Sequence, residues 1–221
     1  SCAAEIPISI NVTGNATTSV KNYYGGIAGR IFRDGGTDRF VSVDKCYVNK
    51  LLSAVSPYDI YGGGILGLYH DKFSDSSVDD EFAGLEISEC YNTGDISATG
   101  ESVFCGGILG DALGTKGNKA KINMTIKGNM AFNVEIIIAS TTTPSGVNRI
   151  SGGENWTWSD PNKFKNYGLS EMTLIGLDGG VEGLPVLRTQ INRIWFVNLN
   201  WDFASTWQWD DSLKRPVFQW R

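Results

Sequence analysis

The chain has 221 residues, 41% of them hydrophobic and 19% charged, with a formal net charge of −5 and a pI of about 4.9. This acidic balance argues against a nucleic-acid-binding surface, because such surfaces hold phosphates with clustered lysine and arginine. No apolar run reaches the roughly 18 residues that a membrane-spanning helix needs, so we expect no membrane insertion by this chain.

A short glycine-rich phrase recurs along the chain. It reads Tyr-Gly-Gly-Ile-Ala-Gly at 24–29, Gly-Gly-Gly-Ile-Leu-Gly at 62–67 and Cys-Gly-Gly-Ile-Leu-Gly at 105–110, with a degraded copy at 147–152. Repetition with a period of about 40 residues is typical of a solenoid, whose coils bury apolar surface against their neighbours. The phrase residues that we interpret as structural are Gly26, Ile27, Gly29, Gly64, Ile65, Gly67, Gly107, Ile108, Gly110, Ile150 and Gly152.

The isoleucine of each copy is expected to point inward, so that the four form one continuous and fully buried column. The glycines beside it permit a positive φ or a tight bend where a side chain would collide with the adjacent coil.

A second phrase precedes each copy and is centred on a cysteine. Cys2, Cys46 and Cys90 are spaced 44 residues apart, and a weak fourth copy surrounds Asn129. Equivalent positions stack in a solenoid, so these thiols should form an internal ladder of small buried groups. A disulfide is the alternative, although ladder side chains point in parallel. A metal site is disfavoured, because the chain has no CxxC pair and a single histidine.

Short apolar runs bounded by turn residues predict strands throughout the repeats, and no helical period is visible. Variable insertions follow the glycine phrases at Arg30–Asp38, Leu68–Phe82 and Asp111–Lys121. Because they occupy equivalent points of the repeat, they should emerge along one edge of the solenoid, where insertions often build a binding surface.

The C-terminal part is rich in aromatic residues. Solenoid ends expose the apolar core and need a cap, so we expect a solenoid over 1–172 and a capping segment over 173–221 packed on its end. Tryptophans of the tail could instead form a platform on which sugar rings stack, and Trp201 and Trp209 are the residues considered for this role.

The ordered phrases resemble a known family. Residues 90–110 (CYNTGDISATG…CGGILG), 129–172 and the Trp-rich tail at 201–220 are similar to GLUG-motif repeats of bacterial surface proteins, found in adhesins of Bacteroides-like organisms and beside immunoglobulin-A-cleaving metalloproteases. The resemblance implies a right-handed parallel β-solenoid that is secreted to the cell surface. It implies no catalytic residues, because the metalloproteases carry their zinc motif in a separate domain and this chain has no HExxH.

Two polar stretches of the chain are candidate sites, and each has a simpler interpretation. His70 is expected to be a solvated loop residue, since no nucleophile accompanies it. The acidic stretch that contains Asp71, Asp75 and Asp79 could bind a ligand or Ca²⁺ through its oxygens, but it lacks the order of an EF-hand, so a solvated charged loop is favoured.

The sequence therefore predicts an all-β, non-enzymatic adhesion or binding module at the bacterial cell surface or secreted. Its expected partners are a host glycan or extracellular protein and further domains of the same polypeptide before residue 1, because the chain opens inside a repeat. We expect a monomer with no cofactor and no metal. The alternative is a carbohydrate-active β-helix enzyme, which a pocket with two converging carboxylates would support.

Overall fold

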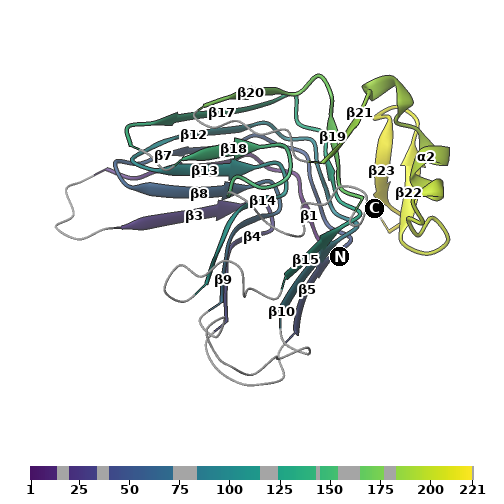
Figure 1. Ribbon diagram of the computed structural model, residues 1–221. Coiled ribbons are helices and arrows are strands. Elements are labelled where there is room, and N and C mark those ends of the chain that lie inside the picture. The colour runs from purple at the N-terminus through teal and green to yellow at the C-terminus, as the bar shows by residue number, and fades with distance from the viewer. Residues whose placement is uncertain are drawn as a thin grey trace.

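Parallel strands stack into five sheets of a β-solenoid, with one antiparallel hairpin near the C-terminus, in the computed structural model (Figure 1). The structure describes residues 1–13, 20–33, 40–71, 84–114, 124–142, 145–153, 165–176 and 183–220. Within these ranges no helix is both long and apolar enough to cross a membrane. The expected fold class, an all-β parallel solenoid, is confirmed.

We label the five parallel sheets A to E, and from Ala3 to Asn148 the chain visits them in the repeating order A, B, C, D and E. Sheet E contains β5 (Phe40–Asp44), β10 (Gly84–Ser88) and β15 (Met124–Lys127). Sheet A contains β1 (Ala3–Ala4), β6 (Tyr47–Val48), β11 (Tyr91–Asn92), β16 (Met130–Ala131), β19 (Tyr167–Leu169) and β21 (Leu184–Val186). Sheet B contains β2 (Ile8–Asn11), β7 (Leu52–Val55), β12 (Ile96–Gly100), β17 (Glu135–Ser140) and β20 (Thr173–Ile175).

The other two solenoid sheets meet at the glycine phrase. Sheet C contains β3 (Lys21–Gly25), β8 (Asp59–Gly63), β13 (Val103–Gly106) and β18 (Gly146–Asn148). Sheet D contains β4 (Ala28–Arg33), β9 (Leu66–Asp71) and β14 (Leu109–Gly114). After the solenoid come the short 3-10 helix η4 (Arg188–Gln190), the helix α2 (Arg193–Asn198) and the hairpin of β22 (Trp207–Asp210) and β23 (Arg215–Phe218).

Alternation of side chains explains these strands. In β10, Leu85 and Ile87 are fully buried while Glu86 between them points outward, the period-two pattern of a half-buried strand. The same two faces repeat in each coil, because β10 pairs in register with β5 on one side and β15 on the other. The core is therefore a set of apolar columns that run along the solenoid axis.

The four phrase isoleucines lie one above another. The amide of Ile27 donates to Ile65 O at 3.1 Å, that of Ile65 to Ile108 O at 2.9 Å, and that of Ile108 to Ile150 O at 3.0 Å. Ile65 and Ile108 are fully buried and Ile150 is nearly so, but Ile27 is only partly buried. The expectation of full burial is wrong for Ile27, because it lies in the first coil and has a neighbouring coil on one side only.

Close backbone packing accounts for the phrase glycines. A Cβ on Gly64 would collide with the carbonyl of Gly107 and the side chain of Asn92, and a Cβ on Gly67 would lie 2.6 Å from Tyr24 O. The bend between sheets C and D therefore packs closely against sheet A. Sheets D and E extend from the body of the solenoid as two arms (Figure 1). None of the phrase glycines has a positive φ, so close approach and not left-handed backbone requires them. The same crowding is found at Gly26, Gly29, Gly107, Gly110 and Gly152.

The cysteine ladder is continued by asparagines. The amide of Cys46 donates to Cys90 Sγ at 3.4 Å, that of Cys90 to Asn129 Oδ1 at 3.0 Å, and that of Asn129 to Asn166 Oδ1 at 3.1 Å. Cys46, Cys90 and both asparagines are buried, whereas Cys2, at the start of the ladder, is exposed. The ladder thus satisfies one buried backbone amide in each coil, so its cysteines act as polar acceptors as well as small apolar groups.

All four cysteines are free thiols in the structure. A hydrogen bond from Cys90 lowers the pKa of the Cys46 thiol to about 7, whereas burial raises the pKa of Cys90. We expect mass spectrometry under denaturing, non-reducing conditions to count four free thiols. In the native protein iodoacetamide should modify the exposed Cys2 well before the buried Cys46, Cys90 and Cys105. A Cys46–Cys90 crosslink would contradict this prediction.

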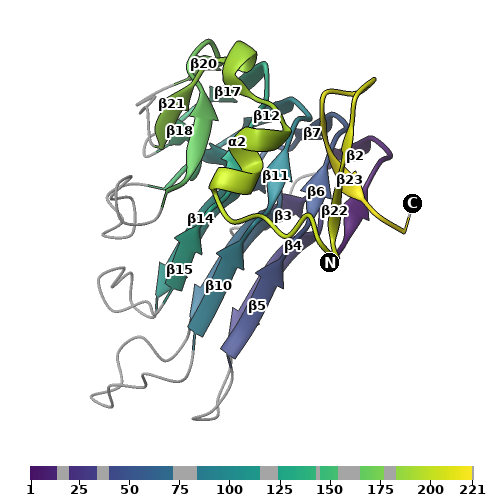
Figure 2. The same cartoon turned by 90° about the vertical axis from the view of Figure 1, so that its right-hand side faces the viewer.

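The segment of residues 187–220, here called the C-terminal segment, lies beside the solenoid and not on its end (Figures 1 and 2). Its aromatic rings contact an outward row on or just after the strands of sheet A, in four successive coils. The pairs of ring centroids are Tyr47–Phe218 at 5.1 Å, Tyr91–Trp207 at 5.9 Å, Phe132–Phe196 at 6.1 Å and Tyr167–Trp195 at 5.0 Å. The expected position on the solenoid end is therefore wrong, because apolar side chains on the outside of sheet A offer the segment a lateral surface to bury.

The boundary of the solenoid also differs from the expected residue 172. Both β20 and β21 pair in parallel with solenoid strands, β20 with β17 and β21 with β19. The solenoid thus extends to Val186.

Candidate binding surfaces

The insertion edge is the side of the solenoid where sheet D ends and sheet E begins. The strands of sheet D end at Arg33, Asp71 and Gly114, and those of sheet E begin at Phe40, Gly84 and Met124 (Figures 1 and 2). The residues between them, 34–39, 72–83 and 115–123, lie outside the described part of the chain, and so do Asp75 and Asp79. Asp71 is the last residue of β9.

The predicted insertions begin too early in the sequence. Their first residues, including Arg30, Leu68 and Asp111, belong to the strands of sheet D. Leu68 and Tyr69 are fully buried, so they are part of the core and not of a display loop. The start of the insertion could not be placed correctly from the sequence, because the polar residues Tyr-His-Asp at the end of the strand resemble the beginning of a loop.

His70 also lies on β9 and not in a loop. Arg30 Nη2 is 2.7 Å from His70 Nδ1, and the ring of Phe32 meets the imidazole edge-on with centroids 5.0 Å apart. The Arg30 guanidinium lies 4.5 Å from the centroid of Phe32 and 5.1 Å from that of Tyr23. His70 therefore packs in a corner between sheets C and D.

A charged cleft of about 490 Å³ lies between the outer face of sheet E and Leu199 of the C-terminal segment. The hydroxyl of Ser88, which lines the cleft, lies 3.2 Å from Asp44 Oδ1 and 3.0 Å from Glu86 Oε1, and its single proton is shared between these two acceptors. Lys127 pairs with Glu86 at 3.0 Å. Most of the charged groups in the cleft thus have a partner of opposite charge or a hydroxyl. The cleft is lined by Ser42, Asp44, Lys45, Glu86, Ser88, Glu89, Lys127, Gly128, Lys165 and Leu199.

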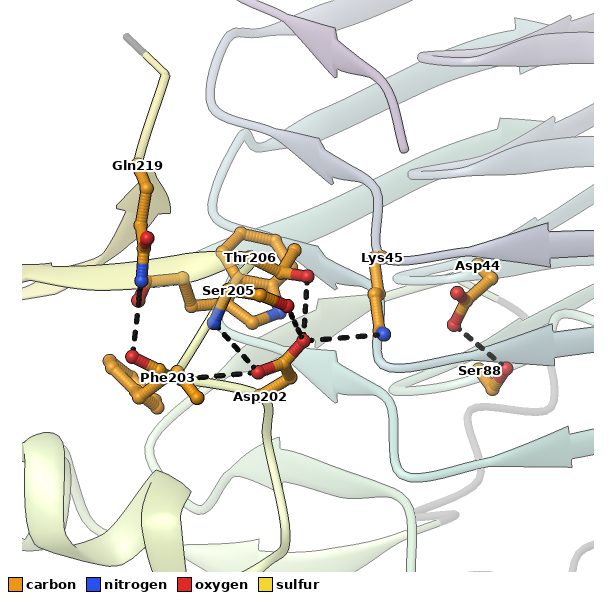
Figure 3. Close-up of polar contacts among 10 residues, drawn as sticks. Asp44, Lys45, Ser88, Asp202, Phe203, Ser205, Thr206 and Gln219 are labelled. Carbon is orange, nitrogen blue, oxygen red and sulfur yellow. Dashed lines mark hydrogen bonds and ion pairs between the residues drawn. The ribbon is translucent and has the colours of Figure 1, made fainter.

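Asp202 joins the C-terminal segment to this cleft (Figure 3). Its carboxylate accepts hydrogen bonds from the amides of Ala204 and Ser205 and from the hydroxyls of Ser205 and Thr206, and it lies 3.8 Å from Lys45 Nζ. The hydrogen bonds, those of Ser205 first, hold the pKa of Asp202 at about 2, well below its usual value. Asp202 is therefore ionised and fixed in place.

Glu89 differs from the other carboxylates of the cleft. Burial raises the pKa of Glu89, and the negative charges of Asp44 and Asp202 raise it further, whereas the positive charge of Lys45 lowers it. Its Oε2 is buried without a hydrogen-bond partner. Glu89 also has a positive φ of 50°, as do the equivalent Lys45 and Lys165, so the cleft is lined by a column of strained residues. The signal in the sequence for this column is the charged residue that stands directly before Cys46 and before Cys90.

The tail tryptophans divide into two groups. Trp201 and Trp207 are 3% and 0% exposed and pack among the aromatic rings against sheet A. Trp201 is therefore not accessible to a ligand, contrary to the role considered for it. Trp209 is half-buried and lines a pocket of about 390 Å³, which we call the hairpin pocket. This pocket is formed by Arg193, Phe203, Trp207, Gln208, Trp209, Asp211 and Gln219.

Comparison with solved structures finds a protein of the same fold. It is described as a "putative immunoglobulin A1 protease" from Bacteroides ovatus, and it is similar to this chain with a TM-score of 0.56 and 22% sequence identity. The similarity covers 89% of this chain and 53% of that protein, so the chain spans about half of the other's length. No protein-family model matches the chain, and no curated protein is similar to it. The likeness shows the fold alone.

Proposed function

We propose that the chain is a non-enzymatic binding module of a secreted or cell-surface bacterial protein, which presents its repeat surface to a host glycan or extracellular protein. The observation that carries the proposal is the common insertion edge. In three successive coils the strands of sheet D end, and those of sheet E begin, along this edge, and the stretches of sequence between them differ in length. The repeats of this chain differ from one another mainly along this edge, whereas the isoleucine column recurs in each of them. Such an arrangement suits the display of a recognition surface on a regular scaffold.

The likeness to the Bacteroides ovatus protein supports an extracellular setting. Immunoglobulin A1, which its name gives as the target, is a secreted host glycoprotein. A module of the same fold beside a protease could hold such a target while another part of the polypeptide cleaves it. A screen of the purified chain against arrays of glycans and host matrix proteins tests the proposal, and the absence of any saturable ligand would contradict it.

Shortening the second insertion separates binding from folding. Residues 72–83 should be replaced by a tight turn, with β9 kept intact because Leu68 and Tyr69 belong to the core. We expect the melting temperature to change little, since the fully buried residues on either side, such as Leu68 and Leu85, lie outside the replaced range. Binding of the ligand found by the array should weaken.

The control for this variant is Trp209→Ala in the full-length chain, which leaves the insertion edge unchanged. If the shortened chain binds as tightly as wild type while Trp209→Ala does not bind, the recognition surface is the C-terminal segment and the edge model is wrong.

Glu89 favours a second candidate function, carbohydrate hydrolysis. A carboxyl with a raised pKa beside an ionised Asp202 resembles the acid and base that glycoside cleavage requires. Release of reducing ends from polysaccharides by the wild-type chain, and its loss in Glu89→Gln, would replace the non-enzymatic proposal with this one.

A further inference from the structure

The hairpin pocket is lined by aromatic rings, two side-chain amides and a guanidinium, which are groups of the kinds that contact sugar rings and carboxylates. We propose that it binds a saccharide residue that carries a carboxylate, with the ring of the sugar against Trp209 and its carboxylate on Arg193. The inference rests on the proposed binding function and assigns it a second surface, separate from the insertion edge.

Trp209 is held as a fixed platform. Its ring contacts that of Phe196 in a tilted arrangement, with centroids 6.0 Å apart, and its indole N–H donates to Asp211 Oδ1 at 3.2 Å. Trp207 beneath the pocket is fully buried. A large flat ring fixed in this way offers contact area at little cost in conformational entropy, which favours stacking against the C–H groups of a pyranose.

Two glutamine side chains supply polar groups in fixed orientations. Gln219 Nε2 donates to the carbonyls of Phe203 at 3.1 Å and Trp207 at 3.0 Å, which orients its Oε1 as an acceptor. Gln208 Nε2 lies 3.4 Å from the carbonyl of Phe218. Side-chain amides both donate and accept, so they match sugar hydroxyls. A few oriented polar groups around an apolar surface are typical of small-molecule sites.

Arg193 selects for charge. Its guanidinium lies 5.5 Å from the centroid of Phe203, and within the described residues it forms no ion pair. The Asp211 carboxylate that also lines the pocket is paired with Lys214 at 3.7 Å, which offsets its repulsion of an anion. A guanidinium without a carboxylate partner presents the fork of donors that binds a carboxylate in two parallel hydrogen bonds.

The size of the pocket favours one or two sugar rings. About 390 Å³ lies at the lower end of the range for small-ligand pockets. An extended polyanion is disfavoured, because the chain as a whole has a net charge of −5. An acidic peptide remains the competing ligand class and is included in the test.

The experiment uses the full chain and matched pairs of methyl glycosides that differ in a carboxylate: glucuronide beside glucoside, and galacturonide beside galactoside. Binding is followed through the indole N–H signals in ¹H–¹⁵N NMR spectra. For at least one pair we expect the acidic member to bind about tenfold more tightly than the neutral one, the usual scale of one charge-assisted contact. Arg193→Gln should abolish that preference while the neutral sugar still binds.

Trp209→Ala should weaken both members of the pair, and Trp220→Ala is its matched control. Trp220 is 62% exposed and stacks on Phe218 without lining the pocket, so its removal also deletes an accessible indole. Circular dichroism and thermal melting check that each variant folds. Arg193→Gln keeps the test valid even if Trp209→Ala does not fold.

Three results would overturn the inference. The first is that neither acidic glycoside shifts an indole signal at millimolar concentration. The second is that Trp220→Ala weakens binding as much as Trp209→Ala. The third is that acetyl-glutamate amide binds while the sugars do not. If the pocket variants keep wild-type affinity for an array ligand, the pocket assignment fails and the binding function stands. If no array ligand is found yet the glycosides bind at Trp209, the pocket stands and the insertion-edge proposal fails.

Discussion

Replacing Gly63 with alanine should destabilise the solenoid by about 3 kcal/mol or more, at the upper end for an overpacked core site. A Cβ at this position would overlap the carbonyl oxygen of Leu66 and lie 2.7 Å from the amide nitrogen of Gly110. Both are backbone atoms of sheet D, so no side-chain rotation can relieve the collision, and the bend between sheets C and D must open. Urea denaturation followed by far-ultraviolet circular dichroism measures the loss.

Gly128 provides the matched control. It has a positive φ of 66°, but its added Cβ would meet no atom closer than Glu89 N at 4.0 Å. The equivalent positions in other coils hold Lys45, Glu89 and Lys165 with the same left-handed backbone. Gly128→Asn should therefore cost no more than about 1 kcal/mol. Equal losses in the two variants would mean that close packing is not what the phrase glycines provide.

Truncating Ile108 to alanine should lower the free energy of unfolding by about 2–5 kcal/mol. Ile108 is fully buried in the isoleucine column, with Ile65 in one neighbouring coil and Ile150 in the other. The coils on both sides are fixed by their own hydrogen bonds, so they cannot collapse far into the cavity that the variant leaves. Urea denaturation again provides the measurement.

Ile175 is the control for this truncation. It lies on β20 of the same solenoid and is 50% exposed. Ile175→Ala should change stability by less than about 0.5 kcal/mol, as most surface substitutions do. An Ile108→Ala variant that unfolds at the same urea concentration as wild type would show that the column does not carry the stability of the stack.

The lateral position of the C-terminal segment connects the two candidate surfaces. Lys45 of the solenoid lies 3.8 Å from Asp202 (Figure 3), and the charge of Asp202 helps to raise the pKa of Glu89. Both interactions depend on the position of the segment along sheet A. The same packing buries Trp201 and leaves Trp209 at the hairpin pocket. Had the segment covered the solenoid end, neither arrangement would exist.

The stacking of the coils follows from the repeat pattern of the sequence. A repeat of nearly constant length fixes which residues lie above one another, since each coil pairs in register with the next, and this is why Ile65 and Ile108 fall in one column. The alternation of faces within strands such as β10 also follows from the sequence. The starts of the insertions do not, because the polar ends of the sheet D strands resemble loop sequence.

The packing on the outside of the stack depends on contacts between residues that are far apart in the sequence. The hydroxyl of Tyr91 donates to the carbonyl of Pro216, 125 residues away, and no periodic pattern links two such positions. At Cys46-Tyr47 and Cys90-Tyr91 the cysteine turns inward and the tyrosine after it turns outward, so two stacked tyrosine rings lie on the outside of sheet A, where the rings of the C-terminal segment contact them. An aromatic tail buries its rings against any apolar surface of matching shape. The position of that surface depends on the assembled solenoid and not on any local run of residues.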